Sequence, residues 1–448
     1  MLKTPRSANL AAAAMQRFMQ PFRRFFETET SGGIVLLFAT FIALALANSP
    51  WSEKYTAIWQ TPAAITVNGF KLELPLLLWV NDALMTLFFF VVGLEIKREI
   101  VLGELREWRK AALPVLAAVG GMIAPAVIFL ALRAGKEGAR GWGIPTATDI
   151  AFVVGFLALF GRRVPLGLKI MLLSLAIADD IGAVVLIAVF YSNDVSVFPL
   201  LGAAVGFGLV VTLRYLGVNR IGIYVLLGIA IWFAFLQAHV HPTVAGVILG
   251  LLTPTVAQYE GTEMLENVDR LLSRMRQSVP HGSEQVKLLH QLESAAWQSV
   301  SPQERLEVTL HPWVAFFIVP IFALANAGVE IRPESIRHGV GWAIALGLFL
   351  GKPLGIVAAS ALAIKLKLAK LPTGVNWRIM LGAGCLGGIG FTMSVFIAGL
   401  ALPDQLLDSA KIGILAGSLL SSVVGTIILA ASLPERAPLD KEANGEMP

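Results

Sequence analysis

Two adjacent carboxylates, Asp179 and Asp180, lie in the middle of an otherwise uncharged apolar stretch from Ile170 to Tyr191. This stretch is long enough to cross a hydrocarbon core of roughly 30 Å. On insertion scales an aspartate at the centre of a membrane helix costs about 2.5–3.5 kcal/mol, so stability does not explain a consecutive pair. Carboxylates kept at such a cost usually line an ion or proton path. We therefore expect the pair to bind protons or cations.

A lone lysine, Lys352, lies inside another apolar run, far from both of its ends. Its side chain cannot easily reach water, so it needs a carboxylate or a carbonyl partner. The candidate carboxylates are Asp149, Asp179 and Asp180. Neighbouring helix positions point about 100° apart, so the two adjacent aspartates can have separate roles.

Three carboxylates and one ammonium group, all ionised, would leave net negative charge in a site of low dielectric. Four buried charges at about 3 kcal/mol each would cost on the order of 12 kcal/mol, which is comparable with the stability of a whole domain. Either protonation or capture of a hard cation relieves this cost, and both use the same oxygen lone pairs. If the helices change their open side only when the charge is compensated, the competition becomes an exchange of metal ion for proton. Acid pH should then suppress transport.

Two apolar runs contain residues that interrupt a helix. The first interruption is residues 141–149, with two glycines before Pro145, and the second is residues 382–392, with five glycines within nine residues. Proline removes a backbone donor and disfavours helix at the preceding residue, while glycine loosens the helix. In lipid, non-helical backbone survives only where protein or a watery cavity satisfies it. One such segment in each half of the chain indicates a transporter site near the midplane.

Composition places the whole chain in a membrane. Of its 448 residues 56% are hydrophobic and only 15% are charged, whereas soluble domains carry about 25% charged residues. The net charge of +5 does not require a nucleic acid, because much of the Lys and Arg lies in loops on one side. The single cysteine, Cys385, excludes an intrachain disulfide and a multi-cysteine metal cluster. We expect the lipid bilayer as surroundings and no cofactor other than transported ions.

The pattern of apolar runs predicts an all-α polytopic protein with about twelve transmembrane helices. The runs lie near residues 32–48, 75–96, 111–132, 143–160, 165–191, 197–215, 219–237, 241–254, 312–329, 339–364, 375–399 and 410–432. We expect a helical domain at residues 27–433 between two tails, residues 1–26 and 434–448.

The distribution of Lys and Arg predicts the orientation. Breaks rich in these residues lie at 3–24, 97–110, 162–163, 214–220 and 365–378. Opposite breaks carry few or balanced charges, except the one with Arg133, Lys136 and Arg140. Both tails should be cytoplasmic. Residues 256–310, which are polar with apolar residues at helical spacing, should form a cytoplasmic loop with two short amphipathic helices.

Residues 65–74 alternate apolar and polar side chains on both sides of Asn68-Gly69, a strong signal for a β-hairpin between the first and second helices. An isolated two-stranded hairpin is marginally stable in water, so it should pack against something. Packing against its own subunit and packing against a second protomer are equally compatible with the pattern.

Several motifs together resemble those of the NhaA-type sodium/proton antiporters. They are Thr148-Asp149-Ile-Ala-Phe, Ala178-Asp179-Asp180-Ile-Gly-Ala, Phe322-Ala-Leu-Ala-Asn-Ala-Gly, Gly351-Lys352-Pro353-Leu-Gly and Gly388-Ile-Gly-Phe-Thr-Met-Ser. The resemblance extends over residues 26–432. It implies a bacterial inner-membrane antiporter that is not an enzyme, exports Na+ or Li+ in exchange for external protons, and contributes to sodium and pH homeostasis. It also implies inverted repeats (spans three to five and ten to twelve), with the fourth and eleventh helices discontinuous and crossing; this family is itself an example from which the rule linking broken helices to transport sites was drawn.

The resemblance also implies roles for individual residues. Asp180 would be the central ligand of the transported Na+, and Asp179 its partner in binding cation and proton. Asp149 and Lys352 would balance the partial charges of the broken helix ends, Lys352 also pairing with Asp179, and Thr148 would be an oxygen ligand.

A cytoplasmic pH-responsive cluster is implied as well. Its matching positions are Glu95, Arg98, Glu99, Glu307 and His311. Val308 stands where the family often has a histidine, which leaves the pH set-point and any imidazole role open. The resemblance further suggests a homodimer joined through residues 65–74.

Two rival functions remain. A sodium-coupled carrier of another solute could use the same architecture, although the aspartate pair favours direct proton exchange. An intramembrane aspartyl protease would need two carboxylates that share a proton, such as Asp149 with Asp179 or Asp180. Against this second rival, the Gly-x-Gly-Asp pattern is absent and Lys352 would disturb the pair.

Overall fold

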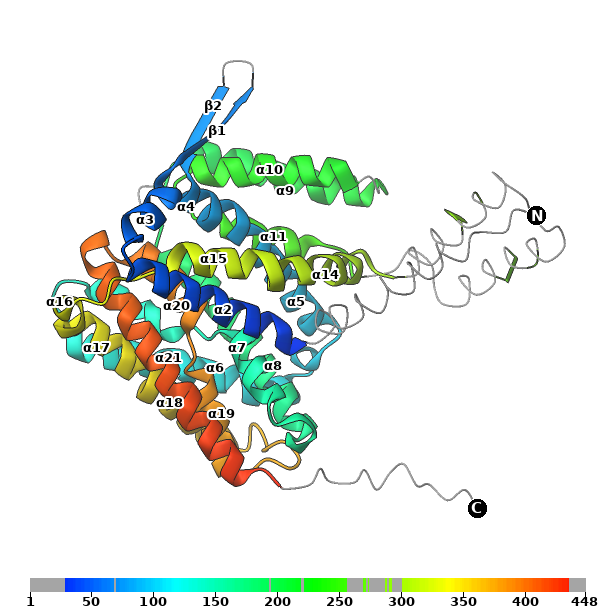
Figure 1. Ribbon diagram of the computed structural model, residues 1–448. Helices are drawn as coiled ribbons and strands as arrows, with labels where there is room; N and C mark the ends of the chain where they lie inside the picture. Colours follow the sequence, from blue (N-terminus) through cyan, green and yellow to red (C-terminus); the bar gives the residue numbers. More distant parts are fainter. Residues whose placement is uncertain are drawn as a thin grey trace, which may run out of the picture. The chain divides into compact units, whose positions relative to one another are not determined.

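The computed structural model describes residues 29–67, 70–192, 195–218, 221–255 and 300–434, together with residues 269–270, 273, 287 and 290–291. The predicted tail 1–26, the C-terminal tail beyond Pro434 and most of the predicted loop 256–310 lie outside this set. The chain divides into two compact units, which we describe separately (Figure 1).

The first unit comprises residues 1–84, 107–191 and 315–448. Its long helices are α2 (Glu29–Ala47), α6 (Trp108–Arg133), α8 (Leu166–Phe190), α18 (Lys352–Lys365) and α21 (Asp404–Ser432). Its shorter helices are α3 (Ser52–Gln60), α4 (Leu76–Leu78), α7 (Ile150–Ala158), α15 (Val319–Asn326), α16 (Pro333–Arg337), α17 (Gly339–Leu346), α19 (Trp377–Gly387) and α20 (Phe391–Ala401). A 3-10 helix covers Ala139–Thr146, and π-helical turns cover Trp79–Leu84 and Gly347–Gly351.

The second unit comprises residues 85–106 and 192–314. Its described helices are α5 (Met85–Val101), α9 (Val197–Tyr215), α10 (Ile221–Gln237), α11 (Thr243–Leu252) and α14 (Pro302–Trp313). Backbone contact between α5 and α11 is close, since a Cβ at Gly93 or at Gly250 would overlap the backbone of the facing helix.

The predicted apolar spans correspond to helices of the structure. Within the described ranges, eight helical segments are long and apolar enough to cross a membrane, and two bent pairs of helices bring the number to as many as ten. Two shorter apolar helices, Ile221–Gln237 and Thr243–Leu252, occupy the positions of the seventh and eighth predicted runs. The structure thus confirms the all-α polytopic class.

One predicted boundary is wrong. The ninth helical segment begins at Pro302 rather than near residue 312, so the end of the predicted loop 256–310 is helical. Ser301 caps this helix by accepting a hydrogen bond from the Glu304 N–H at 3.2 Å. Pro302 at the first helical position has no N–H and therefore needs no acceptor. The apolar pattern missed these turns because they are amphipathic and carry buried Glu307 on a helix that is polar overall.

The predicted hairpin is confirmed. Strand β1 (Pro62–Val67) pairs antiparallel with β2 (Phe70–Pro75), with Ile65 opposite Leu72. Trp79 donates from Nε1 to the carbonyl of Ala63 at 3.1 Å, which ties the hairpin to its own chain. Ile65 nevertheless remains 53% exposed, so part of the apolar surface of the hairpin is not covered by its own chain.

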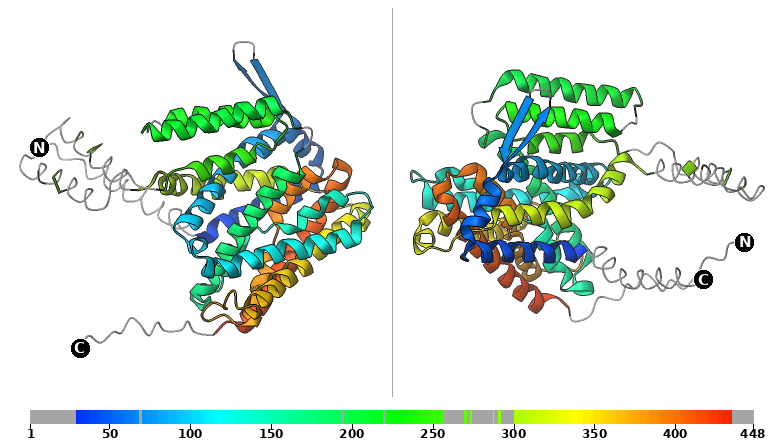
Figure 2. Two further views of the ribbon diagram at one scale, coloured as in Figure 1. Left: turned by 180° about the vertical axis from the view of Figure 1, so that it is seen from behind. Right: turned by 45° about the horizontal axis from the view of Figure 1, so that its top comes forward.

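In the first unit, α6 and α18 lie side by side (Figure 2). Their backbones touch at Gly120 and Gly355, where an added Cβ on either residue would overlap the carbonyl oxygen of the other. Small residues allow such approach where lipid supplies no hydrophobic drive for helix association. This contact brings Lys352, one turn before Gly355, into the interior.

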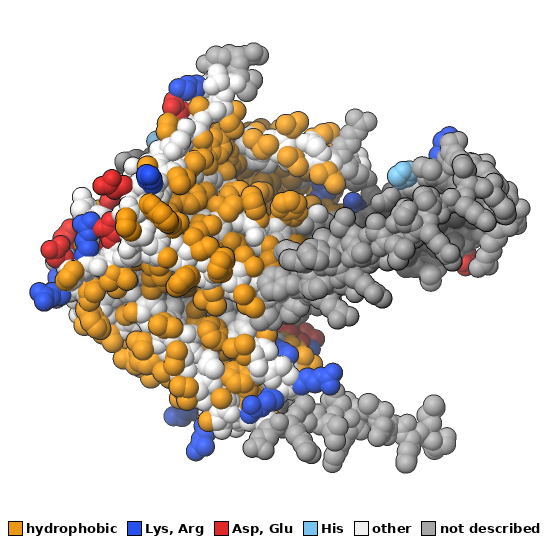
Figure 3. All heavy atoms as spheres, in the orientation of Figure 1, with side chains coloured by type: hydrophobic (Ala, Val, Ile, Leu, Met, Phe, Trp, Pro, Cys, Tyr) orange, Lys and Arg blue, Asp and Glu red, His pale blue; other side chains and the backbone are white. Residues whose placement is uncertain are grey.

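Apolar side chains cover the outer faces of α2 and α21. Phe38, Phe41, Leu419 and Ile427 are among the exposed ones. Figure 3 shows hydrophobic side chains over this face of the molecule and charged ones near its margins. Such a surface suits acyl chains rather than water.

Gly355→Ala should lower the stability of the protein by about 1–3 kcal/mol, because the new methyl group forces α6 and α18 apart. The measurement is thermal unfolding of the detergent-solubilised protein. Gly399→Ala is the matched control, since a Cβ there meets nothing within 4 Å and alanine favours helix. Equal melting temperatures for the two variants would contradict the close α6–α18 contact.

Candidate functional site

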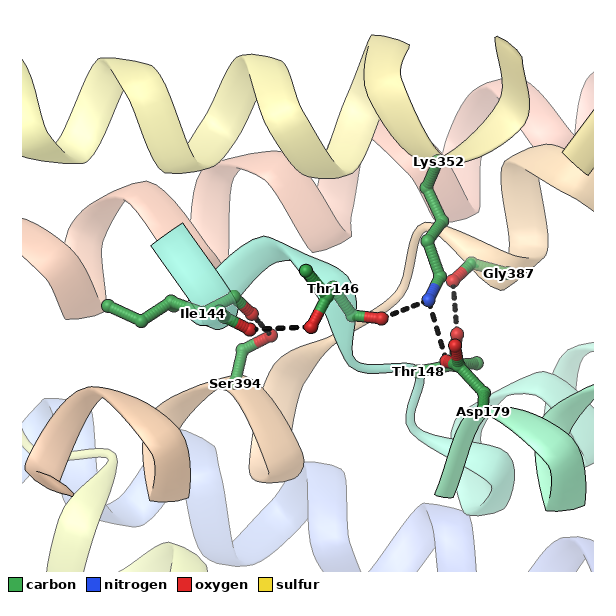
Figure 4. A network of polar contacts seen from close by, with 8 residues as sticks. Ile144, Thr146, Thr148, Asp179, Lys352, Gly387 and Ser394 are labelled. Atoms are coloured by element: carbon green, nitrogen blue, oxygen red, sulfur yellow. Dashed lines mark hydrogen bonds and ion pairs between the residues drawn. The ribbon is translucent and has the colours of Figure 1, made fainter. Parts of the chain in front are cut away.

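Both interrupted helices of the first unit are broken where the sequence predicts, and the two breaks touch. Extended backbone at residues 147–149 separates the 3-10 helix from α7, and residues 388–390 separate α19 from α20. The Thr148 hydroxyl donates to the carbonyl of Gly387 at 2.8 Å (Figure 4). The Asp149 N–H donates to the carbonyl of Ile389 at 2.7 Å. The prediction of two discontinuous helices that meet is confirmed.

Asp149 lies between the first turns of two half-helices. Its Oδ1 accepts a hydrogen bond from the Phe152 N–H of α7 at 3.4 Å. Its Oδ2 accepts from the Thr392 N–H of α20 at 3.0 Å and from the Thr392 hydroxyl. Helix N-termini carry partial positive charge, so one buried carboxylate stabilises both.

Whereas Asp149 lies at helix N-termini, Lys352 lies at the C-terminal end of the 3-10 helix. It is 0% exposed and donates from Nζ to Asp179 Oδ2 at 2.6 Å and to the carbonyl of Thr146 (Figure 4). Thr146 is the last residue of the 3-10 helix, whose carbonyl end carries partial negative charge. Asp179, one of the three carboxylates considered from the sequence, therefore forms an ion pair with the lysine.

The two adjacent aspartates are both buried in α8. Asp179 is 1% exposed and Asp180 is 4% exposed. The second oxygen of Asp179, Oδ1, is buried and receives no hydrogen bond of normal geometry from the residues described. Thr148 lies beside this carboxylate (Figure 4). A buried oxygen without a donor is costly, and a proton or a hard cation would remove that cost.

Sequence reasoning missed two hydroxyl side chains of the site, those of Thr392 and Ser418. Ser418 Oγ of α21 accepts hydrogen bonds from the N–H groups of Gly390 and Phe391, both at 3.2 Å. An interrupted helix must find acceptors for its orphan donors, and that requirement was the available signal. The apolar helix at 404–432 contains several serines and a threonine, so the sequence could not single out Ser418.

The second unit holds the proposed pH-responsive residues on α5 and α14. Arg98 forms an ion pair with Glu307, which is buried, and Glu95 lies within electrostatic range of both. Gln303, which the sequence did not indicate, donates from Nε2 to Glu307 Oε2 at 3.1 Å and to the carbonyl of Leu94 at 3.0 Å.

The remaining members of this predicted group are placed differently. Glu99 is buried and accepts from the Glu104 N–H at 3.1 Å, at the end of α5. His311 is exposed on α14. Val308 is 66% exposed, so position 308 faces away from the Arg98–Glu307 pair.

Known proteins match almost the whole chain. The profile of the family described as "Na+/H+ antiporter 1" matches residues 23–429. A protein of Sorangium cellulosum named Na(+)/H(+) antiporter NhaA 2 is 47% identical over 430 residues, which are 94% of this chain and 92% of that protein. Proteins named Na(+)/H(+) antiporter NhaA from Rhodopirellula baltica and Rhizobium meliloti are each 45% identical; the matches cover 94% and 92% of this chain, and 96% and 95% of those proteins.

Lys352→Met should destabilise the protein by about 3–5 kcal/mol, because it leaves the Asp179 carboxylate buried without its cation. Adding Asp179→Asn should restore much of the loss, since the double variant has no unpaired charge. Thermal unfolding in detergent measures all three proteins. Lys169→Met, at an exposed position of α8, is the control and should change stability by no more than about 0.5 kcal/mol. Additive losses in the double variant would contradict the pairing.

Proposed function

The chain belongs to the Na+/H+ antiporter 1 family, and we propose that it exports Na+ or Li+ from the cytoplasm in exchange for external protons at the Asp179–Asp180 pair. One observation supports this site above all others. Asp179 Oδ1 is buried and receives no hydrogen bond of normal geometry from the described residues, while Oδ2 is held by Lys352. Asp179 Oδ1 could therefore bind a proton or a cation.

Competition for these oxygens would couple the two ions. A proton or an alkali cation neutralises the same carboxylates, and hard cations prefer oxygen ligands. Asp180 would be the central ligand, Asp179 its partner, and the Thr148 hydroxyl oxygen a further ligand beside the pair. The protein would switch the side on which the site is open only when a cation or a proton neutralises the carboxylates. Each turnover would therefore carry one kind of ion in each direction.

The charges of the broken helices would be balanced by two residues that do not bind the cation. Asp149 accepts from the N-terminal N–H groups of α7 and α20, and Lys352 donates to the carbonyl end of the 3-10 helix. The interrupted segments could then persist at membrane depth while leaving backbone oxygens near the site.

Access to the site requires a conformational change, because both aspartates are almost completely buried. A ligand shifts such an equilibrium only by its difference in affinity between the states. A cation or proton that neutralises the pair would supply this difference, since an uncompensated charge is costly to carry through a closed state.

We propose the Arg98–Glu307 pair, with Glu95 and Glu99, as the pH-responsive group at the cytoplasmic side of the second unit. Exposed His311 adds no geometric support to this proposal. A homodimer joined through the hairpin, both termini in the cytoplasm and placement in a bacterial inner membrane are likewise proposals; the exposed Ile65 supports the first.

The protease alternative finds no support in the geometry. Such an enzyme needs two carboxylates that share a proton. Asp179 is instead bound to Lys352, and Asp149 is occupied by donors from α7 and α20.

Asp180→Asn should reduce Na+-driven proton movement at least about 100-fold, which corresponds to about 2.7 kcal/mol. The assay loads proteoliposomes with a pH gradient and records proton movement after addition of Na+, Li+ or K+. Asp404→Asn, an identical substitution at an exposed position, serves as control and should transport at the parent rate. Transport by Asp180→Asn at the parent rate would refute the site.

The apparent KM for Na+ should rise as the pH falls, approaching about tenfold per pH unit at acid pH if one proton competes with one cation. Protons fill the carboxylates at low pH, so the suppression should be overcome by more Na+. Initial rates measured at several Na+ concentrations and pH values, with equal pH on both sides of the membrane and a Na+ gradient as driving force, provide the test. A KM independent of pH would argue against competition for shared oxygens.

A further inference from the structure

The break between α19 and α20 leaves five consecutive backbone N–H groups, at residues 388–392, outside regular helix hydrogen bonding in the interior. The first two turn back to α19. Gly388 donates to the carbonyl of Cys385 at 2.9 Å, and Ile389 donates to that of Leu386 at 3.0 Å. These bonds close the end of α19 without help from another helix.

The other three N–H groups depend on side chains from distant parts of the chain. Thr392 donates to Asp149 Oδ2 at 3.0 Å. Gly390 and Phe391 both donate to a single atom, Ser418 Oγ, at 3.2 Å each. A hydroxyl oxygen has two lone pairs, so one serine satisfies both donors.

Ser418 lies near the middle of α21 and is almost fully buried. Its neighbour Gly417 lets the helix approach α17, because a Cβ at Gly417 would be 3.0 Å from Ala345 Cα. The charged residues of α21, in contrast, lie in its first turns, at Asp404, Asp408 and Lys411. At the level of the break, α21 thus contributes a hydroxyl and no charge.

We infer that Ser418 is a positioning residue for antiport, which fixes the start of α20 so that Thr392 and Asp149 keep their places beside the ion-binding pair. This inference rests on the proposed site at Asp179 and Asp180. Without the hydroxyl, two buried N–H groups would lose the acceptor that they share, and an unsatisfied buried donor is costly.

The first turn of α20 would then have to move toward another acceptor. Asp149 is the acceptor already engaged by the next N–H, that of Thr392. Any shift there reaches Thr148, because Thr148 is the residue before Asp149 and is itself bonded to Gly387 across the break. Thr148 lies beside the Asp179 carboxylate, so the shift would change how the pair holds a cation.

The test measures the Na+ dependence of proton movement in proteoliposomes for Ser418→Ala. We expect the KM for Na+ to rise about tenfold or more, which corresponds to about 1.4 kcal/mol, with the maximal rate within about twofold of the parent. Ser418→Thr keeps the hydroxyl and should keep the parent KM. Where Ser418→Ala fails to accumulate in the membrane, Ser418→Cys takes its place and should raise the KM at least about threefold, since sulfur is a weak acceptor.

Ser422→Ala is the matched control, because Ser422 lies one turn further on the same helix and donates to its own helix at the carbonyl of Leu419, at 2.8 Å. A parent KM in the Ser418 variant, with or without a lower melting temperature, would overturn the inference, and so would an equal rise in Ser422→Ala. Absence of Na+-driven proton movement in the parent protein would instead refute the proposed transport, so the two failures are distinguishable.

Discussion

The ion pair between Lys352 and Asp179 is the interaction on which the rest of the site depends. Both side chains are removed from water at a depth where each charge alone would be costly, and each is tolerable because the other lies 2.6 Å away. The pair leaves one carboxylate oxygen without a regular partner, since Asp179 Oδ1 receives no hydrogen bond of normal geometry from the described residues. Under the function proposed above, an arrangement that is stable enough to fold and still leaves a buried carboxylate oxygen without a regular hydrogen bond would be suited to bind a small cation and release it again.

The interrupted helices follow from the same constraint. A continuous helix would consume its own carbonyls and N–H groups, whereas the two breaks leave these groups available at membrane depth. Each helix end contacts a side chain of opposite charge. The N-terminal N–H groups of α7 and α20 donate to Asp149, and the carbonyl end of the 3-10 helix accepts from Lys352. Helix dipoles, backbone polarity and side-chain charge thus form a single balanced arrangement in the first unit.

Sequence reasoning identified the charged residues and the interruptions because both break strong rules for membrane helices. It left Lys352 with three candidate partners, since a helical pattern does not tell which carboxylate of another helix faces it. Thr392 and Ser418 were not identified because polar uncharged residues are common in such helices and their partners lie far away in sequence. Gln303 was not identified because it lies in the segment predicted as a loop. The sequence did not predict that α14 begins at Pro302, because hydropathy identifies only apolar segments. The first turns of this helix are recognisable only by the Ser301 cap.

The backbone contact at Gly120 and Gly355 limits how the molecule can rearrange. Two helices whose main chains touch cannot slide along each other without lifting a peptide group over its neighbour. Lys352 therefore moves together with α6, and its ammonium can separate from Asp179 either by rotation within a side chain or by movement of α8, which carries Asp179. Repositioning of the lysine relative to α6 thus becomes a change of rotamer, a fast local event, while any slower movement of α18 has to include α6 as part of the same rigid block.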